Sequence, residues 1–190
     1  FLVGTGLAGS VWIARSMMQE SPDFERQRAQ GTVPANPLRH TLVNHRLGIF
    51  RSFSISALGS ITYYVGITYV PAFLSSTGST SERVSLWLAT IAAVAVILVT
   101  PLAGILSDRI GRKPVLVSLC LFSALLPAAM FSLMGGGSPA LALVGAVVLA
   151  CMAGGVSAVG AAATAEQFPG EGRVSGLALG ATSATAIFGG

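Results

Sequence analysis

The chain has 190 residues, of which 53% are apolar and only 9% are charged. A soluble domain carries about 25% charged residues, so this chain has too few charges to hold its apolar surface in water. Long uncharged blocks, residues 52–81, 84–107 and 114–165, are separated by short polar stretches. We therefore predict an integral membrane protein. The composition excludes a secreted disulfide scaffold, a disordered chain and a coiled coil.

The uncharged blocks predict six membrane segments. About 20 apolar residues in a helix cross a bilayer core of roughly 30 Å, so each of the first two blocks holds one span and the longest holds two. A Gly-Gly-Gly-Ser-Pro run at 135–139 divides the longest block, because glycine and proline end helices. The predicted segments are residues 1–14, 46–74, 85–107, 114–134, 139–165 and 174–190. We expect the first and last to be incomplete spans of a longer protein truncated at both ends.

The basic residues predict the orientation of these spans. Ten of the 11 Lys and Arg residues lie in or beside the loops 17–45, 107–114 and 165–174, and only Arg83 lies on the other side. The positive-inside rule places those three loops in the cytoplasm of a multi-pass protein of the cell's inner (plasma) membrane. The basic charge thus reports topology. We expect no nucleic-acid partner, because no basic face is interleaved with aromatic residues.

The loop 17–45 is the one long polar stretch, and it has two parts. Ser21 as N-cap and Pro22 at the first helical position predict a short surface helix over residues 20–28. The following stretch, 31–37, contains glycine and two prolines and is typical of a linker. We predict a cytoplasmic connection between two membrane bundles.

Few residue types suited to metal binding or catalysis are present. His40 and His45 lie five residues apart without carboxylate or thiolate companions, so we expect no metal site. Cys120 and Cys151 sit within apolar segments and are interpreted as small core residues. An integral-membrane enzyme would need several such groups converging in the bundle, and the protein is therefore not expected to be an enzyme.

The most informative motif is the loop at 107–114, which joins two spans through very few residues. Asp108 sits at the C-terminal end of a predicted helix, where the helix dipole disfavours an anion. It should therefore face either a cation, such as Arg112 or Lys113, or the N-terminus of another helix. Gly111 permits the tight reversal. A simple basic anchor would explain the cations but not Asp108 or the glycine. The residues that define this loop motif are Gly104, Asp108, Arg109, Gly111, Arg112 and Lys113.

Segment 46–74 carries a polar stripe. Ser52, Ser56, Ser60 and Tyr63 recur at three- and four-residue steps and share one helical face, which lipid tolerates poorly. The substrate-path candidates are Ser56, Ser60, Tyr63 and Tyr64. In the alternative interpretation, the serines bond to their own i−4 carbonyls and the tyrosines are interface anchors.

The run from Gly104 to Pro114 resembles the signature loop of the major facilitator superfamily, in its copy between the eighth and ninth spans. Two further stretches agree: Glu20-Ser21-Pro22, and Glu166-Gln167-Phe168-Pro169 followed by Arg173. Within the superfamily, residues 61–71 and 184–190 resemble the metabolite:proton symporters, which carry α-ketoglutarate, citrate, shikimate or proline and betaine. One departure is Ala181-Thr182-Ser183, where many relatives carry an aromatic residue and often an asparagine.

The resemblance implies an all-α polytopic membrane protein with the major facilitator superfamily transporter fold, mostly its C-terminal six-helix bundle. Residues 1–16 would end the sixth span of the N-terminal bundle. Residues 17–45 would form the cytoplasmic inter-bundle loop, and residues 46–190 would form spans seven to eleven, the last incomplete.

The resemblance also implies a function, namely proton-coupled uptake of a small organic acid or osmolyte by alternating access of two bundles about a central site. The implied partners are a small solute, protons and the lipid bilayer, with no cofactor and a monomeric protein. The loop motif that contains Asp108 and Arg112 would be the cytoplasmic gating motif. Asp108 with Arg112, and Glu166 with Arg173, are the expected inner-face charge pairs. The proton-coupling residues would lie in the N-terminal bundle.

Alternatives remain within and outside the transporters. A sugar porter-type facilitator or proton symporter shares the Glu-Ser-Pro and Glu-x-Phe-Pro strings and is the second choice. A drug:proton antiporter would show efflux instead of uptake. A channel or receptor would not need the short acidic and basic loop at 107–114.

Overall fold

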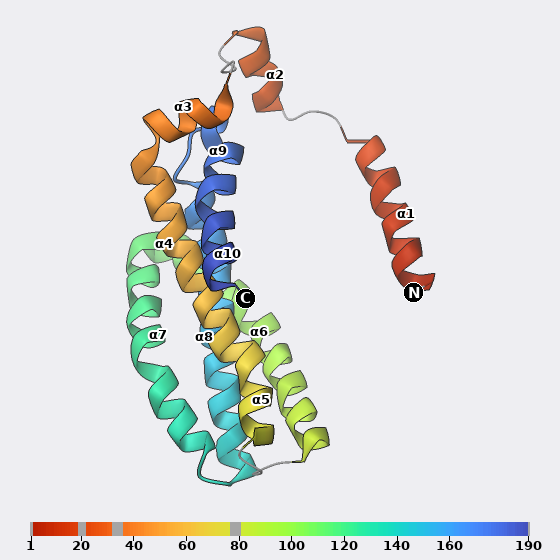
Figure 1. Cartoon of the computed structure of the whole chain (residues 1–190), viewed down its shortest axis with the longest axis vertical. Helices are drawn as coiled ribbons and strands as arrows, with labels where there is room; N and C mark the ends of the chain where they lie inside the picture. Colours follow the sequence, from red (N-terminus) through yellow and green to blue (C-terminus); the bar gives the residue numbers. More distant parts are fainter. Residues whose placement is uncertain (1, 19–21, 32–35, 77–80, 190) are drawn as a thin grey trace.

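A computed structural model describes residues 2–18, 22–31, 36–76 and 81–189. Within them every regular element is helical, and the long helices run side by side as a bundle (Figure 1). Three short helices precede the bundle: α1 (Leu2–Ser16), α2 (Pro22–Ala29) and α3 (Pro37–Asn44). The bundle helices are α4 (Arg46–Tyr63), α5 (Tyr69–Ser76), α6 (Glu82–Ile110), α7 (Arg112–Met134), α8 (Pro139–Ala165), α9 (Gly170–Leu177) and α10 (Ser183–Phe188).

The four complete spans expected from the sequence are confirmed. Helices long and apolar enough to cross a membrane cover Arg46–Ser76, Arg83–Ile110, Arg112–Met134 and Pro139–Ala165. Their ends lie within a few residues of the predicted ends, because the charged residues and the glycine and proline run stop the helices where the apolar blocks stop. The all-α membrane fold is therefore correct.

Helix α8 is the centre of the bundle and packs against α4, α6 and α7. Its most apolar stretch is 61% buried, against 28% or less in the other three spans. Glycines allow this close packing: a Cβ on Gly154 would lie 3.0 Å from Val96 Cγ1, and one on Gly155 would lie 3.2 Å from Leu119 Cδ2. Helices α6 and α7 therefore approach the α8 backbone closely at two adjacent glycines.

Two helical segments are interrupted by a π-helical turn. The turn η1 (Tyr64–Thr68) lies between α4 and α5, and η2 (Ala178–Thr182) lies between α9 and α10. Each turn presses one buried glycine against a neighbouring helix. A Cβ on Gly66 would lie 2.7 Å from the Leu149 carbonyl oxygen, and one on Gly180 would lie 2.6 Å from Ser52 Oγ. Since π-helical turns are frequent at functional sites, both positions point to the space between these two helical segments as a candidate site.

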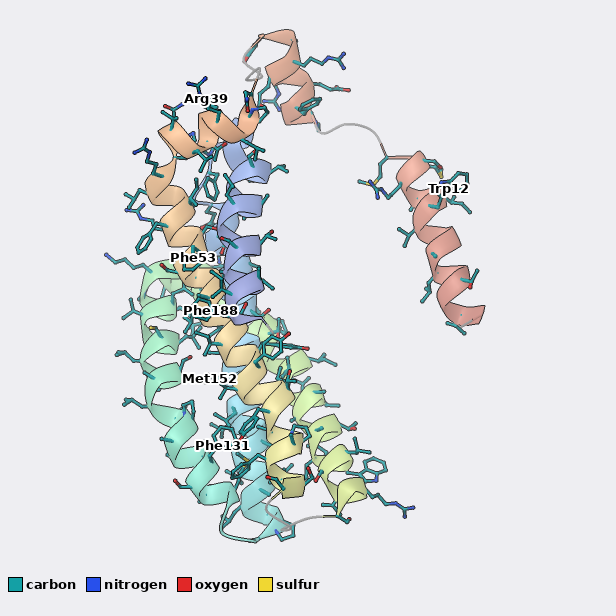
Figure 2. The ribbon with its side chains drawn as sticks, in the orientation of Figure 1. Trp12, Arg39, Phe53, Phe131, Met152 and Phe188 are labelled. Atoms are coloured by element: carbon teal, nitrogen blue, oxygen red, sulfur yellow. The ribbon has the colours of Figure 1, made fainter. Side chains whose placement is uncertain are left out.

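The short helices before the bundle differ partly from expectation. The predicted surface helix over 20–28 corresponds to α2, although Glu20 and its expected N-cap Ser21 lie outside the described residues. Residues 32–35 of the expected linker also lie outside them. Helix α1 stands apart from the bundle, and Trp12 on it is exposed (Figure 2).

Helix α3 was not predicted, because the polar loop was taken to continue to residue 45. Its start nevertheless has a clear local cause: Asn36 Oδ1 accepts a hydrogen bond from the Arg39 N–H at 3.3 Å, and Pro37 is the first helical residue. Thr41 is fully buried where α3 packs on α9. The end of the loop 17–45 that forms α3 is thus held against the bundle.

The hydrogen bond from the Arg39 N–H to the N-cap residue Asn36 leads to a first prediction. In Asn36→Ala, α3 should lose about 1 kcal/mol of helix stability, since the capping acceptor is gone. Amide hydrogen exchange of residues 39–44 should become faster, while exchange in α4 stays unchanged. Equal exchange in α3 of both proteins would mean that packing on α9, and not the cap, holds the helix.

Candidate functional site

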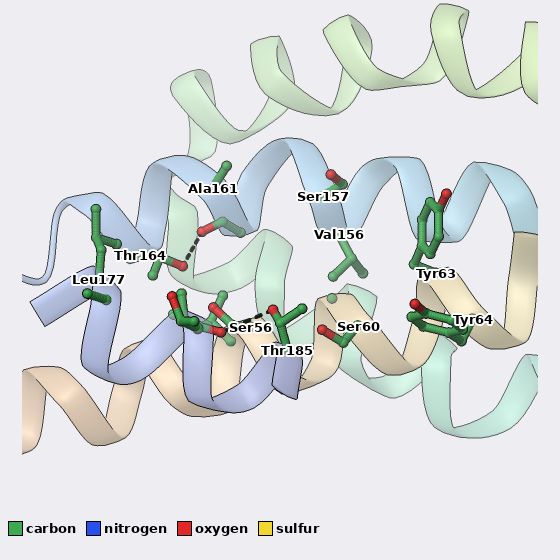
Figure 3. Close-up of a pocket in the computed structure, with 16 residues that line it drawn as sticks. Ser56, Ser60, Tyr63, Tyr64, Val156, Ser157, Ala161, Thr164, Leu177 and Thr185 are labelled. Atoms are coloured by element: carbon green, nitrogen blue, oxygen red, sulfur yellow. Dashed lines mark hydrogen bonds between the residues drawn. The ribbon is translucent and has the colours of Figure 1, made fainter. Parts of the chain in front are cut away.

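A cavity of about 700 Å³ opens between α4, α8 and the C-terminal helices (Figure 3). Tyr63 and Tyr64 lie at one end of it and Leu177 at the other. We call it the hydroxyl-lined cavity. It is lined by Ile55, Ser56, Gly59, Ser60, Tyr63, Tyr64, Val156, Ser157, Gly160, Ala161, Thr164, Leu177, Ala178, Ala181, Thr182 and Thr185.

None of these lining residues carries a charge at neutral pH, and the polar groups are hydroxyls. Four of them form no hydrogen bond with any described residue: Ser56, Ser60, Ser157 and Thr182. Outside the cavity, Ser54 Oγ donates to the Phe50 carbonyl at 2.9 Å. Thr62 Oγ1 donates to the Leu58 carbonyl at 2.8 Å. The serines of α4 that face the cavity therefore keep donors and acceptors available for a bound solute.

Two tyrosines form the aromatic end of the cavity. The rings of Tyr63 and Tyr64 meet edge to face, with centroids 5.7 Å apart and planes at 76°. Both side chains are exposed to the cavity side of the bundle, and neither hydroxyl bonds to a described residue. Edge-to-face contact holds the two rings in a defined geometry while leaving both hydroxyls free.

All four substrate-path candidates, Ser56, Ser60, Tyr63 and Tyr64, line the cavity. Ser52, the inner end of the predicted stripe, does not. It is fully buried against the η2 turn, and its Oγ has no hydrogen-bond partner in the described structure. At Ser52 the stripe is covered by η2 and no longer faces the cavity, because Gly180 lets η2 pack closely on α4.

Residues from other helices complete the cavity and were not predicted as site residues. Ser157 comes from α8, and Thr182 and Thr185 come from η2 and α10. The only sequence signal was the change of residue type at Ala181-Thr182-Ser183. Thr185 and Thr164 are less available than the others, since Thr185 Oγ1 bonds to the Ala181 carbonyl and Thr164 Oγ1 to the Gly160 carbonyl.

The loop between α6 and α7 holds a charged cluster centred on Arg112. Its guanidinium bonds to Asp108 at 2.5 Å, to Ser107 Oγ at 2.8 Å and to Glu166 at 3.2 Å. Ser107 is buried, while the two carboxylates are exposed. Arg112 thus joins the end of α6 and the start of α7 to the end of α8.

The structure places the remaining motif residues around this cluster. Gly111 has φ 96°, a conformation that favours glycine, which explains how this single residue can separate the end of α6 from the start of α7. Arg109 and Lys113 are exposed and form no ion pair with a described residue. A Cβ on Gly104 would meet no atom within 4 Å, so close packing within the described chain does not require this glycine.

One expected pair is wrong in this structure. Glu166 was expected to pair with Arg173, but its carboxylate bonds to Arg112. The reason is geometric: α7 and α8 pack along each other, which brings the first residue of α7 to the last turn of α8. Arg173 projects from the exposed side of α9 and forms no ion pair with a described residue.

The histidines and cysteines do not form a cluster. The rings of His40 and His45 lie 5.8 Å apart, and no three His, Cys, Asp or Glu side chains converge anywhere in the described ranges. Cys151 is half-buried, but Cys120 is exposed on α7, so its interpretation as a core residue was wrong. Most side chains of segment 114–134 are exposed within the described structure, and the spacing of its apolar residues did not predict this.

Comparison with known proteins agrees with this geometry. A model of the Major Facilitator Superfamily matches residues 51–190. Over the whole chain, 28% of residues are identical to the α-ketoglutarate permease of Escherichia coli, and 27% to the citrate-proton symporter of Klebsiella pneumoniae; the match covers 43% of each of those proteins. A proline/betaine transporter of Escherichia coli is 33% identical over 121 residues, which are 63% of this chain and 24% of that protein.

The chain therefore spans less than half the length of the curated relatives it matches. No solved structure matches it.

Proposed function

Because the chain belongs to the Major Facilitator Superfamily, we propose that it is part of a proton-coupled transporter that takes up a small organic acid or osmolyte. The matched relatives are named as permeases, symporters and transporters, and none is named as an enzyme. The solutes in those names suggest α-ketoglutarate, citrate, or proline and betaine as the class to test. The protein is a multi-pass membrane protein, and we place it in the inner (plasma) membrane.

One observation carries this proposal: four hydroxyls of the cavity lining have no hydrogen-bond partner among the described residues, those of Ser56, Ser60, Ser157 and Thr182. Ser54 and Thr62, which lie on α4 with Ser56 and Ser60 but outside the cavity, are bonded internally. A hydroxyl that is not bonded internally and lines an open cavity remains available to water or to a solute. A cavity of about 700 Å³ is also in the range of small-molecule sites. The cavity thus has the size and the free polar groups of one half of a solute site.

The absence of charge among the lining residues limits what this half of the site does. Hydroxyl groups can orient a carboxylate, carbonyl or hydroxyl of the solute, but they cannot neutralise a full negative charge. We therefore assign the charge-compensating and proton-coupling groups to the remainder of the transporter. This half would supply orientation and specificity.

The charged cluster supplies the second part of the proposal. We place the loops 17–45, 107–114 and 165–174 in the cytoplasm. There, Arg112 with Asp108 and Glu166 would tie three helix ends together when the solute site faces outward. Alternating access requires such a two-state element on one side of the site. Arg109, Lys113 and Arg173 remain free to contact the other bundle.

The proposal is tested with the complete transporter in vesicles containing an internal pH dye. α-Ketoglutarate, citrate, shikimate, proline, betaine and glucose are added one at a time. Acidification on addition of an organic acid or osmolyte is expected. Entry of labelled glucose without acidification would instead identify a sugar porter-type facilitator, and solute efflux would identify an antiporter.

The hydroxyl groups of the cavity give a second prediction. In the complete transporter, Ser60→Ala and Ser157→Ala should each raise the KM for the transported solute about two- to tenfold, the effect of losing one hydrogen bond. Ser54→Ala is the matched control, because it removes a hydroxyl from the same helix that is bonded internally. A KM change in Ser54→Ala equal to that in Ser60→Ala would argue against direct solute contact.

A further inference from the structure

A second hollow, of about 260 Å³, adjoins the tyrosine end of the hydroxyl-lined cavity. It lies between η1, α5, α6 and α8, and we call it the apolar pocket. Tyr63 lines both hollows, and within the described chain it is the one residue common to the two linings. Figure 3 shows Tyr63 at the end of the hydroxyl-lined cavity opposite Leu177. The side chain of Tyr63 therefore lies between the two spaces.

The two hollows differ in chemistry. Free hydroxyls line the first, whereas every lining residue of the apolar pocket except Tyr63 is glycine, alanine, valine, isoleucine or proline. Val70, Ala146 and Ala150 in its wall are at most 4% exposed, so the pocket reaches the packed core around α8. Such a hollow can accept a small hydrocarbon group but offers no partner to a polar one.

Tyr63 is held in place by its neighbours. Its ring meets that of Tyr64 edge to face, with centroids 5.7 Å apart. The backbone that follows is fixed as well, because Gly66 lies so close to α8 that a Cβ there would be 2.7 Å from the Leu149 carbonyl oxygen. A ring fixed in this way can act as a wall between the hollows, in addition to presenting its hydroxyl.

We propose that Tyr63 is a specificity-determining residue that limits the apolar part of the transported solute. Its ring separates the solute in the hydroxyl-lined cavity from the apolar pocket, so only compact solutes fit. Removal of the ring would join the two hollows, and a larger solute could then place an added hydrocarbon group against Ala93, Ala146 and Ala150. This inference rests on the proposed function, because it concerns the solute of the same cavity.

The test measures how well larger analogues compete with uptake of the labelled parent solute by the complete transporter in vesicles. The parent solutes are proline, betaine, citrate and α-ketoglutarate, each paired with an analogue that carries one added phenyl or benzyl group. The unsubstituted transporter should bind the analogue weakly. In Tyr63→Ala, the ratio of the analogue's inhibition constant to the parent's KM should fall about tenfold, because an aromatic ring becomes buried. Tyr63→Phe keeps the ring and should still exclude the analogue.

Two controls locate the added group. Ala89→Leu/Ala93→Leu narrows the apolar pocket from α6, where the two positions share one helix face. Combined with Tyr63→Ala, it should reverse the tenfold gain; alone, it should leave the parent's KM unchanged. Tyr69→Ala removes a tyrosine that packs on Phe131 and lines neither hollow, so it should leave the ratio unchanged.

Three results would overturn the proposal. Equal inhibition by the analogue with and without Tyr63→Ala would show that the ring does not exclude it. A gain that survives Ala89→Leu/Ala93→Leu would place the added group outside the apolar pocket. A changed parent KM in Ala89→Leu/Ala93→Leu alone would show that the solute already passes Tyr63, and this measurement holds even if Tyr63→Ala does not reach the membrane.

These results are distinct from a failure of the proposed function. In each of the three, the parent solute is still taken up, and only the role of Tyr63 is lost. Absence of uptake of every parent solute by the unsubstituted transporter would instead remove the proposed function, and the role of Tyr63 with it.

Discussion

Replacing Arg112 with glutamine is expected to reduce solute uptake by the complete transporter about tenfold, while the protein still inserts into the membrane. Arg112 bonds to Asp108, Ser107 and Glu166, so this one change removes every link that the cluster makes between α6, α7 and α8. Glutamine keeps hydrogen-bonding capacity but lacks the charge and the branched guanidinium that reach two carboxylates at once. The conformation in which the cluster ties the three helix ends together, with the solute site facing outward, would then be less populated.

Two further variants test whether the loss of uptake comes from the ion pairs of Arg112. Asp108→Asn should also cut uptake, by a similar or smaller factor, because Glu166 still holds Arg112. Arg109→Gln removes a neighbouring cation that forms no ion pair with a described residue, and should do less harm. Uptake is measured with labelled solute in vesicles, and insertion by the amount of protein recovered in the membrane. Normal uptake in both Arg112→Gln and Asp108→Asn would refute the gating role.

The membrane spans could be predicted because the bilayer imposes a simple rule on composition. A span must be apolar over about 20 residues, and it ends where charge, glycine or proline appears. Residues 114–165 therefore divided correctly at the glycine and proline run. Ser56 and Ser60 of α4 line one cavity, as expected for residues four apart on a helix face, whereas Ser52 of the same predicted stripe is buried against η2.

The remaining features depend on contacts between segments. No local pattern shows that Gly180 meets Ser52, or that Arg112 at the start of α7 lies beside Glu166 at the end of α8. The π-helical turns are equally hidden, because they arise where neighbouring helices press on the backbone. Helix α3 is different: Asn36 and Pro37 are a readable start signal, which was missed because the polar loop was treated as one unit.

The two glycines of the π-helical turns lead to the other large effect, on folding. Gly66→Ala would place a methyl group 2.7 Å from the Leu149 carbonyl oxygen, a backbone atom of the central helix that cannot rotate away. Overpacking of this kind costs about 1–3 kcal/mol. The midpoint temperature of unfolding in detergent should therefore fall clearly for Gly66→Ala. Gly180→Ala should also lower it, since its methyl group would meet Ser52 Oγ at 2.6 Å and Cβ at 2.7 Å.

A second substitution should distinguish the two positions. Ser52→Gly removes both side-chain atoms that crowd Gly180→Ala, leaving the Ile49 carbonyl at 2.9 Å as the remaining close contact, so the double variant should recover much of the loss. No such partner exists for Gly66→Ala, because its contacts at 2.7 and 3.1 Å are backbone atoms of Leu149. Gly59→Ala is the control: its Cβ would meet nothing within 4 Å, and alanine is about 1 kcal/mol better than glycine inside a helix. If Gly59→Ala destabilised the protein as much as Gly66→Ala, close contact at the π-helical turn would not be the cause.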